Sequence, residues 1–293
     1  MSRFAYVNGR YERHGLASVS IEDRGYQFAD GVYEVIAIWN GLPVDFCQHM
    51  YRLERSMSEL RFAARPHLSA LSIIGQRVVR LNRVVNGILY IQISRGTATR
   101  NHSFPHIDSG PSVVMTSRSG VGPTDKQVTE GVNLVIQSDE RWGRRDIKSV
   151  GLLANALAKQ RAIDSGAFDA LLVNPDGTVT EASTANIWLV GEDDTLITRP
   201  LGSDILGGIT RARILALAKK AGYRVKEKIF TTDEALTAKE IFLTGTTTFV
   251  LPVVQVDNTI IGGGSPGRIS SVLRDSYKLF LDDIGAESWH VKE

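Results

Sequence analysis

Alternating apolar and polar residues open the chain and predict a β-sheet. The alternation runs through "FAYVNGRYE", where Asn8-Gly9 interrupts it, and through "VYEVIAIWNGLPVDF", where Asn40-Gly41 does. Asn-Gly is the dipeptide that two-residue type I′ turns prefer, because both central residues of such a turn need a positive φ. Both stretches therefore predict β-hairpins.

The hydrophobic period changes at residue 46, where apolar residues begin to recur at steps of three and four. This spacing predicts an amphipathic helix whose apolar positions are Phe46, Met50, Leu53, Met57 and Leu60, with Arg52, Arg55 and Arg61 elsewhere on its surface. A second helix is predicted from Ser69 as N-cap to Gly87 just beyond its end. Two strands follow, "ILYIQISRG" and "SVVMTS", joined by the loop "TATRNHSFPHIDSGP", whose length is typical of functional loops.

A stretch rich in glycine, proline and polar residues, "RSGVGPTDKQ", predicts a linker at residues 119–125 between domains at 1–118 and 126–293. The second half begins with the strand "VNLVIQS" and a helix that carries Leu153 and Leu157 on one side with alanines and ends near Gly166. It continues with a hairpin around Asp176-Gly177, the paired strands "NIWLV" and "TLIT", and the helix "GGITRARILALAKKAGY". The strands "YRVKEKIF" and "EIFLTGTTTFVLPVVQV" and the helix "GRISSVLRDSYKLFLDD" close it. Because most strands are joined by hairpins, the pattern favours an α+β fold of two domains over a regular βαβ succession.

The amino-acid composition limits the kinds of molecule that the protein is expected to bind. The 293 residues include 34 basic and 32 acidic side chains, and the net charge of +2 favours neither nucleic acid nor a membrane surface. Cys47 is the only cysteine, which excludes an internal disulfide and a multi-cysteine metal site and fits a reducing compartment. The chain lacks the apolar run of a signal peptide or a membrane helix, and its six histidines lack metal-ligand spacing. We expect a cytoplasmic protein without a metal, acting on a small charged metabolite.

Lysine is distributed unevenly along the chain. No lysine precedes Lys126, although the same region holds many arginines, so a lysine nucleophile must belong to the second half. Lys148 lies in "RRDIKSVGLLANALAKQ", where a predicted strand gives way to a predicted helix and a side chain can project into a cleft. The alternative interpretation is a surface lysine, or one that forms an ion pair with Asp146.

Two segments have the composition of phosphate-binding turns. "LGGITR", residues 206–211, places two glycines and a threonine at the start of a helix, whose free N–H groups attract anions. "TGTTT", residues 244–248, follows a strand and offers N–H groups with several hydroxyls. Each segment alone is also compatible with an ordinary tight turn. Neither matches the glycine patterns of dinucleotide sites or P-loops, so a nucleotide is not the expected ligand.

Two further features suit an amino acid substrate. Arg100 and His102 lie two residues apart on the long loop, where an arginine can bind a carboxylate bidentately and a histidine can add a hydrogen bond. Glu181 ends a strand and precedes small residues that permit close approach of a flat ligand. The alternatives are a polar loop and a solvated glutamate. Together with the lysine and the phosphate-binding turns, these are the parts of a pyridoxal phosphate enzyme that acts on amino acids.

The order of these motifs resembles the class IV aminotransferases, most closely the D-amino acid branch of that family. The resemblance covers about residues 8–256 and rests on "EDRGYQFADGVYEV", "HMYRL", "SRGTATRNHSFP", "RWGRRDIKSVGLLANALAKQ", "GTVTEASTANIW", "GGITR" and "IFLTGTTT". It implies a smaller N-terminal α/β sandwich, a larger C-terminal pseudobarrel that carries the lysine, pyridoxal 5'-phosphate as cofactor, and a homodimer.

The resemblance also implies residue roles. Lys148 would bind the cofactor covalently and move the substrate's Cα proton, and Glu181 would pair with the protonated pyridine nitrogen. The phosphate would be held by Arg52, Ile209, Thr210 and Thr246, and Gly245, where the most similar D-amino acid enzymes have a hydroxyl residue, would keep a backbone donor. The substrate α-carboxylate would be bound by Tyr33, Arg100 and His102, the last two reaching the site from the neighbouring subunit.

The implied activity is transamination between a D-amino acid, such as D-alanine or D-glutamate, and 2-oxoglutarate or pyruvate. Within the same fold, the alternatives are transamination of L-branched-chain amino acids or amines, and carbon–carbon lysis as in aminodeoxychorismate lyases. From another class, the chain could be a non-catalytic binder of phosphorylated ligands, since a fold does not dictate function. Side chains such as Val35, Tyr90 and Trp142 are expected to shape substrate choice.

Overall fold

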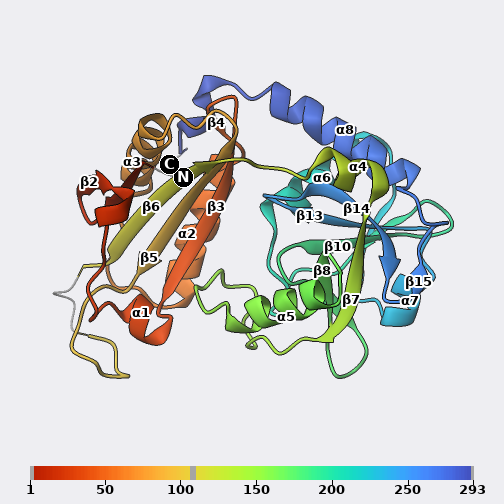
Figure 1. The fold of residues 1–293 in the computed structure, drawn as a ribbon, viewed down its shortest axis with the longest axis horizontal. Helices are drawn as coiled ribbons and strands as arrows, with labels where there is room; N and C mark the ends of the chain where they lie inside the picture. Colours follow the sequence, from red (N-terminus) through yellow and green to blue (C-terminus); the bar gives the residue numbers. More distant parts are fainter. Residues whose placement is uncertain (1–2, 106–109, 292–293) are drawn as a thin grey trace. The chain divides into compact units, whose positions relative to one another are not determined.

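The computed structural model describes residues 3–105 and 110–291 (Figure 1). Contacts divide the chain into two compact units. Unit 1 is formed by Met1–Val121, Ile147–Gly151 and Leu281–Glu293, and unit 2 by Gly122–Asp146 and Leu152–Phe280. The change of unit after residue 121 falls within the predicted linker, and the domain division itself stays a prediction. The short segment that contains Lys148, however, groups with unit 1 rather than with its neighbours in sequence.

Unit 1 is built on a six-stranded antiparallel sheet in the order β2-β1-β6-β5-β3-β4. Its strands are β1 (Phe4–Val7), β2 (Arg10–Arg13), β3 (Gly31–Trp39), β4 (Leu42–Pro43), β5 (Gly87–Ser94) and β6 (Ser112–Ser119). Both predicted Asn-Gly hairpins are confirmed. Asn8 and Gly9 have φ of 46° and 94°, and Asn40 and Gly41 have 51° and 80°, as a type I′ turn requires.

The helices of unit 1 are α1 (Arg24–Phe28), α2 (Phe46–Glu59) and α3 (Leu68–Leu81), with short 3₁₀ turns at His14–Leu16 and Ala286–Trp289. α2 and α3 cover one face of the sheet, and the core between them includes Ile36, Met50, Leu53, Leu71, Leu89 and Met115.

The predicted limits of the second helix were wrong at both ends. Its N-cap is His67 rather than Ser69, and its C-cap is Asn82, whose side-chain amide donates to the carbonyl of Val78 and thereby closes the last turn. Gly87 instead begins β5, where a β-carbon would lie 2.1 Å from the carbonyl oxygen of Arg118.

Unit 2 contains a nine-stranded mixed sheet in the order β12-β11-β10-β13-β14-β7-β8-β9, with β15 paired to β14. Its strands are β7 (Val132–Ser138), β8 (Asp169–Val173), β9 (Val179–Ala182), β10 (Asn186–Val190), β11 (Leu196–Thr198), β12 (Val225–Glu227), β13 (Glu240–Gly245), β14 (Phe249–Val256) and β15 (Thr259–Ile260). β7 runs parallel to β8 and β14, and β12 runs parallel to β11. The sheet curls so that β9, at its edge, also contacts β10, which confirms the predicted α+β class with a barrel-like second sheet.

The remaining helices are α4 (Asp125–Glu130), α5 (Leu153–Asp164), α6 (Ile209–Lys220), α7 (Thr232–Leu236) and α8 (Arg268–Asp282). The apolar side predicted for α5 was partly wrong, because Ala158 and Ala162 are buried while the Leu153 side chain is 75% exposed. None of the helices in the described ranges is long and apolar enough to cross a membrane.

The N-terminus of α8 is capped from another strand. The carboxylate of Glu240 in β13 accepts hydrogen bonds from the backbone N–H groups of Ile269 and Ser270, each at 2.9 Å. Gly267 must lack a side chain there, because a β-carbon would lie 1.9 Å from the Glu240 carboxyl carbon. This contact fixes the start of the helix to the sheet of unit 2.

Candidate active site

Lys148 is held against β3 by its backbone. Its carbonyl oxygen accepts a hydrogen bond from Tyr33 N–H at 3.0 Å, and its N–H donates to Ser56 Oγ at 3.4 Å. Two residues on, Val150 N–H donates to the carbonyl of Gly31 at 3.0 Å. The Lys148 Nζ lies 4.2 Å from the centroid of the Tyr33 ring, close enough for a cation–π contact. The structure therefore brings together the two sequence-predicted residues Lys148 and Tyr33.

Tyr33 lies on the sheet face opposite to α2 and α3, because alternate residues of a strand point to opposite faces. Its ring centroid is 5.8 Å from that of Tyr90, and the Tyr90 hydroxyl donates to Gln92 Oε1 at 2.7 Å. Burial, with a smaller contribution from Tyr33, raises the pKa of Tyr90 to about 12. Tyr90 is therefore a neutral phenol at physiological pH. Val35 lies opposite Tyr90 in the strand register, so the predicted substrate-shaping pair of unit 1 is adjacent.

Arg52 projects from α2 onto the other face of the same strand. Its Nε and Nη2 bind the two carboxylate oxygens of Glu34, each at 2.7 Å, and His49 Nδ1 lies 2.7 Å from Glu34 Oε2. Burial would raise the pKa of Glu34, but Arg52 and His49 outweigh it and lower that pKa to about 2. Burial also lowers the pKa of His49. An ionised, fully buried glutamate that the sequence analysis missed thus fixes the orientation of Arg52.

Arg100 and His102 share one aromatic neighbour. The guanidinium carbon of Arg100 lies 4.6 Å from the centroid of the Phe28 ring, and the His102 ring lies 5.3 Å from it. Their loop is anchored by Arg24, which is 3% exposed and donates to the carbonyl of Asn101 at 2.6 Å. Both side chains are exposed. Residues 106–109 of the predicted loop lie outside the described residues.

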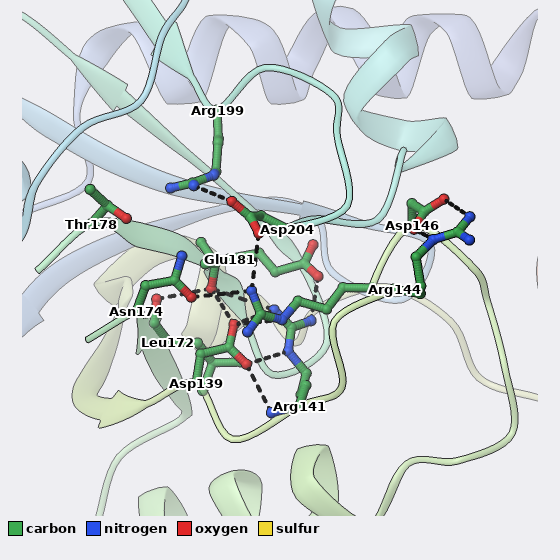
Figure 2. Close-up of polar contacts among 12 residues, drawn as sticks. Asp139, Arg141, Arg144, Asp146, Leu172, Asn174, Thr178, Glu181, Arg199 and Asp204 are labelled. Atoms are coloured by element: carbon green, nitrogen blue, oxygen red, sulfur yellow. Dashed lines mark hydrogen bonds and ion pairs between the residues drawn. The ribbon is translucent and has the colours of Figure 1, made fainter. Parts of the chain in front are cut away.

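Glu181 lies on β9 in unit 2 and is 5% exposed (Figure 2). Its carboxylate accepts hydrogen bonds from Arg141 Nη1, from Asn186 Nδ2 at 2.8 Å and from the N–H of Leu206 at 3.2 Å. Burial raises the pKa of Glu181, and the positive charge of Arg141 opposes that effect. Glu181 was predicted from the sequence, but its side-chain partners Arg141 and Asn186 were not.

Asn186 joins the three segments of unit 2 that the sequence singled out. Besides binding Glu181, its Nδ2 donates to the carbonyl of Leu206 at 2.9 Å, just before α6. A β-carbon on Gly208 would lie 2.0 Å from Asn186 Oδ1, so only glycine fits. Asn186 also pairs in the sheet with Thr244, the first residue of the "TGTTT" segment. An amide that starts the apolar strand "NIWLV" was the signal for this residue in the sequence.

The two predicted phosphate-binding turns have groups that suit an anion. α6 begins at Ile209 and Thr210, and its N-cap, Gly208, has no side chain to cap the first N–H groups. Gly245 ends β13, and its β-carbon would lie 2.8 Å from the hydroxyl oxygen of Thr248. Within residues 3–105 and 110–291, that buried hydroxyl has no hydrogen-bond partner. Thr246 follows in the same turn. Uncapped N–H groups and an unsatisfied hydroxyl are the donors that a phosphate requires.

Comparison with known proteins identifies the family to which this chain belongs. The family model described as amino-transferase class IV matches residues 31–256. The chain belongs to the class IV aminotransferases. Among curated relatives of this aminotransferase, D-alanine aminotransferase of Bacillus licheniformis is 38% identical over 264 residues, 90% of this chain and 92% of that protein. D-alanine aminotransferase of Staphylococcus aureus strain MSSA476 is 35% identical over 277 residues, 94% and 97% of the two chains.

Solved structures support the same fold for this class IV aminotransferase. Branched-chain amino acid aminotransferase of Escherichia coli has a TM-score of 0.91 at 23% identity and covers 100% of this chain and 99% of its own. A branched-chain amino acid aminotransferase from T.th., solved with pyridoxamine 5'-phosphate, has a TM-score of 0.90 at 26% identity, covering 99% and 98%. The family resemblance seen in the sequence is confirmed.

Class IV aminotransferases depend on pyridoxal 5'-phosphate, and the residues of this aminotransferase fit that cofactor. Unit 1 supplies an amine at Lys148 and an oriented guanidinium at Arg52. Unit 2 supplies the buried carboxylate of Glu181 and the donors of the two turns. These are the groups that an aldehyde, a pyridine nitrogen and a phosphate require.

Proposed function

We propose that this enzyme transfers the amino group of a D-amino acid, such as D-alanine or D-glutamate, to a 2-oxo acid, 2-oxoglutarate or pyruvate. The observation that carries the proposal is the 38% identity to a D-alanine aminotransferase over 90% of the chain. Identity to the branched-chain enzymes of known structure is lower, at 23% and 26%.

Lys148 is the catalytic residue of this proposal. Its amine would bind the cofactor covalently, and after the substrate amine displaces it, take the proton from the substrate Cα. The backbone bonds to Tyr33 and Gly31 on β3 support this role, because they fix where the side chain starts. The Tyr33 ring beside Nζ limits the directions in which the amine can turn.

The cofactor, when bound, supplies a ring that takes up the electrons released at the substrate Cα. Glu181 would accept a hydrogen bond from the ring nitrogen and keep that nitrogen protonated. Arg52 would hold the phosphate by charge, and the turns with Ile209, Thr210, Gly245 and Thr246 would hold it mainly through backbone N–H groups. The uncapped helix start and the unsatisfied Thr248 hydroxyl support the second assignment.

Tyr33, Arg100 and His102 would bind the substrate α-carboxylate. We expect Arg100 and His102 to act from the neighbouring subunit of a homodimer, and the rigid attachment of their loop through Arg24 supports such a role. A fixed carboxylate decides which face of the substrate presents its Cα hydrogen to Lys148, and hence which enantiomer reacts. With Cys47 as its only cysteine, the chain can form no internal disulfide, which fits a cytoplasmic location.

The deciding experiment supplies pure protein with pyridoxal phosphate and 2-oxoglutarate, adds D-alanine or L-alanine in parallel, and measures pyruvate. Pyruvate from D-alanine alone is the expected result. A third arm with L-leucine measures 4-methyl-2-oxopentanoate and tests branched-chain transamination. Product from the L-amino acids alone would refute the proposed handedness, and product from no amino acid would favour the lyase or the non-catalytic binder.

A further inference from the structure

Glu181 is surrounded by hydrogen-bond donors. Its two carboxylate oxygens accept from the Arg141 guanidinium, the Asn186 amide and the Leu206 N–H. An ionised carboxylate has about four acceptor positions, so three protein donors leave room for one more. All three partners are donors and Arg141 carries a positive charge, so the arrangement opposes protonation of this carboxylate, which burial alone favours.

Arg141 is itself oriented by a second carboxylate. Asp139, whose side chain is completely buried, accepts from Arg141 Nε at 2.9 Å and Nη2 at 2.7 Å, which leaves Nη1 for Glu181. Thr180, the residue before Glu181 on β9, donates its hydroxyl to Asp139 at 2.6 Å. Although burial raises the pKa of Asp139, the hydrogen bonds and charge of Arg141 lower it below its usual value. The guanidinium is thus held in one plane between two carboxylates.

The charges of this cluster balance. Arg145 forms two ion pairs, from Nε to Asp139 Oδ2 and from Nη1 to Asp204 Oδ1, each at 3.4 Å. Asp204 also pairs with Arg199. With Arg141 and Glu181, the cluster contains three acidic and three basic side chains. Figure 2 shows Asp139, Arg141 and Glu181 close together, and Asp204 beside Arg199. Loss of one member would leave a neighbouring charge buried without its counterion, which is costly.

We infer that Asp139 and Arg141 are positioning residues that keep Glu181 ionised and aimed at the ring nitrogen of the cofactor. This inference rests on the proposed role of Glu181. Without Arg141, burial leaves Glu181 as an uncompensated carboxylate that takes up a proton, and a neutral carboxyl group no longer stabilises a proton on the ring nitrogen. Without the charge of Asp139, Arg141 loses its second anchor and its Nη1 is no longer directed at Glu181.

The test compares four variants as holoenzymes: Arg141→Met, Arg141→Lys, Asp139→Asn and Arg144→Met. Arg144 is the matched control, because it forms a bidentate pair with Asp146 at 2.9 and 3.0 Å in the same connection but is 43% exposed. Pyridoxal phosphate labelled with ¹⁵N in the ring reports by NMR whether the ring nitrogen is protonated, and equilibrium dialysis measures cofactor affinity.

We expect Arg141→Met to move the ¹⁵N signal toward that of the neutral ring and to weaken cofactor binding roughly 10-fold. Asp139→Asn should give a smaller change in the same direction, Arg141→Lys should restore part of the signal, and Arg144→Met should match the wild type. A protonated ring nitrogen in Arg141→Met, or an equal change in Arg144→Met, would overturn the inference. If Arg141→Met does not fold, the ¹⁵N signal and the cofactor affinity of Asp139→Asn and Arg141→Lys test the inference in its place. A wild-type protein that binds no cofactor would instead refute the proposed function.

Discussion

Replacing Glu34 by glutamine tests the buried ion cluster of unit 1. The substitution keeps the size of the side chain but removes the charge that Arg52 and His49 share. A glutamine has one acceptor oxygen instead of two, so its amide group would face the Arg52 donors with a donor of its own. We expect unit 1 to lose stability, because the guanidinium of Arg52 stays buried without its counterion.

The magnitude follows from the pKa of Glu34. Burial raises that pKa, but Arg52 and His49 lower it from 4.5 to about 2. A shift of this size corresponds to about 3 kcal/mol of stability, at 1.36 kcal/mol per unit. Since the folded-state pKa lies below the unfolded one, this stabilisation is complete above about pH 5, about 2 kcal/mol near pH 3.5, and lost near pH 2. The difference between wild type and Glu34→Gln should shrink in the same way.

The assay is urea denaturation, monitored by hydrogen exchange of peptides from β3 and α2. These peptides report on unit 1 alone, whereas an unfolding signal from the whole chain would average over the two units. Glu54→Gln, an exposed position on the same helix, is the control and should change the free energy of unfolding by less than about 0.5 kcal/mol. A loss below about 1 kcal/mol at pH 7, or a difference that stays constant from pH 5 to pH 3, would refute the reasoning.

Three further substitutions test other parts of the molecule. Gly267→Ala should destabilise unit 2 by about 1–3 kcal/mol in urea denaturation, because the new methyl group displaces the Glu240 carboxylate that caps α8. The control is Gly202→Ala, which has open space around it and should leave the stability unchanged. Lys148→Ala, given pyridoxal phosphate, should form no borohydride-reducible adduct on the peptide of residues 144–160, and an adduct there would contradict its role. Arg100→Leu should raise KM for monocarboxylic and dicarboxylic D-amino acids alike; an effect on D-glutamate alone would place Arg100 in the side-chain pocket.

Local sequence patterns were sufficient to predict turns and strands whose structure depends on residues that are adjacent in the chain. The two Asn-Gly turns have the positive φ values that their sequence predicts, and β7 covers the predicted strand of residues 132–138. The short helices α4 and α7 were missed, although each begins with a capping box, at Thr124 with Gln127 and at Thr231 with Glu234. Helices of five or six residues have too few turns to show a hydrophobic period.

Partners of buried charges could not be found in the same way. Glu34 shares its strand face with Val32 and Ile36, so the alternation of residues along the strand is sufficient to place it in the core. The two residues that neutralise it, however, come from α2 after a reversal of the chain, and nothing in their spacing indicates the contact. The same holds for Asn186 and Arg141 around Glu181. The sequence predicted the chemical groups of the proposed site, and packing determined which neighbouring side chains hold those groups.

The place of Lys148 in the fold depends on a strand that is distant from it in the chain. Lys148 follows the predicted linker and β7, so the sequence placed it in the second domain, yet its backbone bonds belong to unit 1. β4 pairs only with the last two residues of β3, which leaves the edge at Gly31 and Tyr33 open. Residues 148–150 satisfy the exposed N–H of Tyr33 and carbonyl of Gly31, and an open strand edge is what attracts such a segment. The position of Lys148, the proposed catalytic residue, is therefore set by an unfilled strand edge more than 100 residues earlier in the chain, and changes in β3 should affect Lys148 more directly than changes in β7.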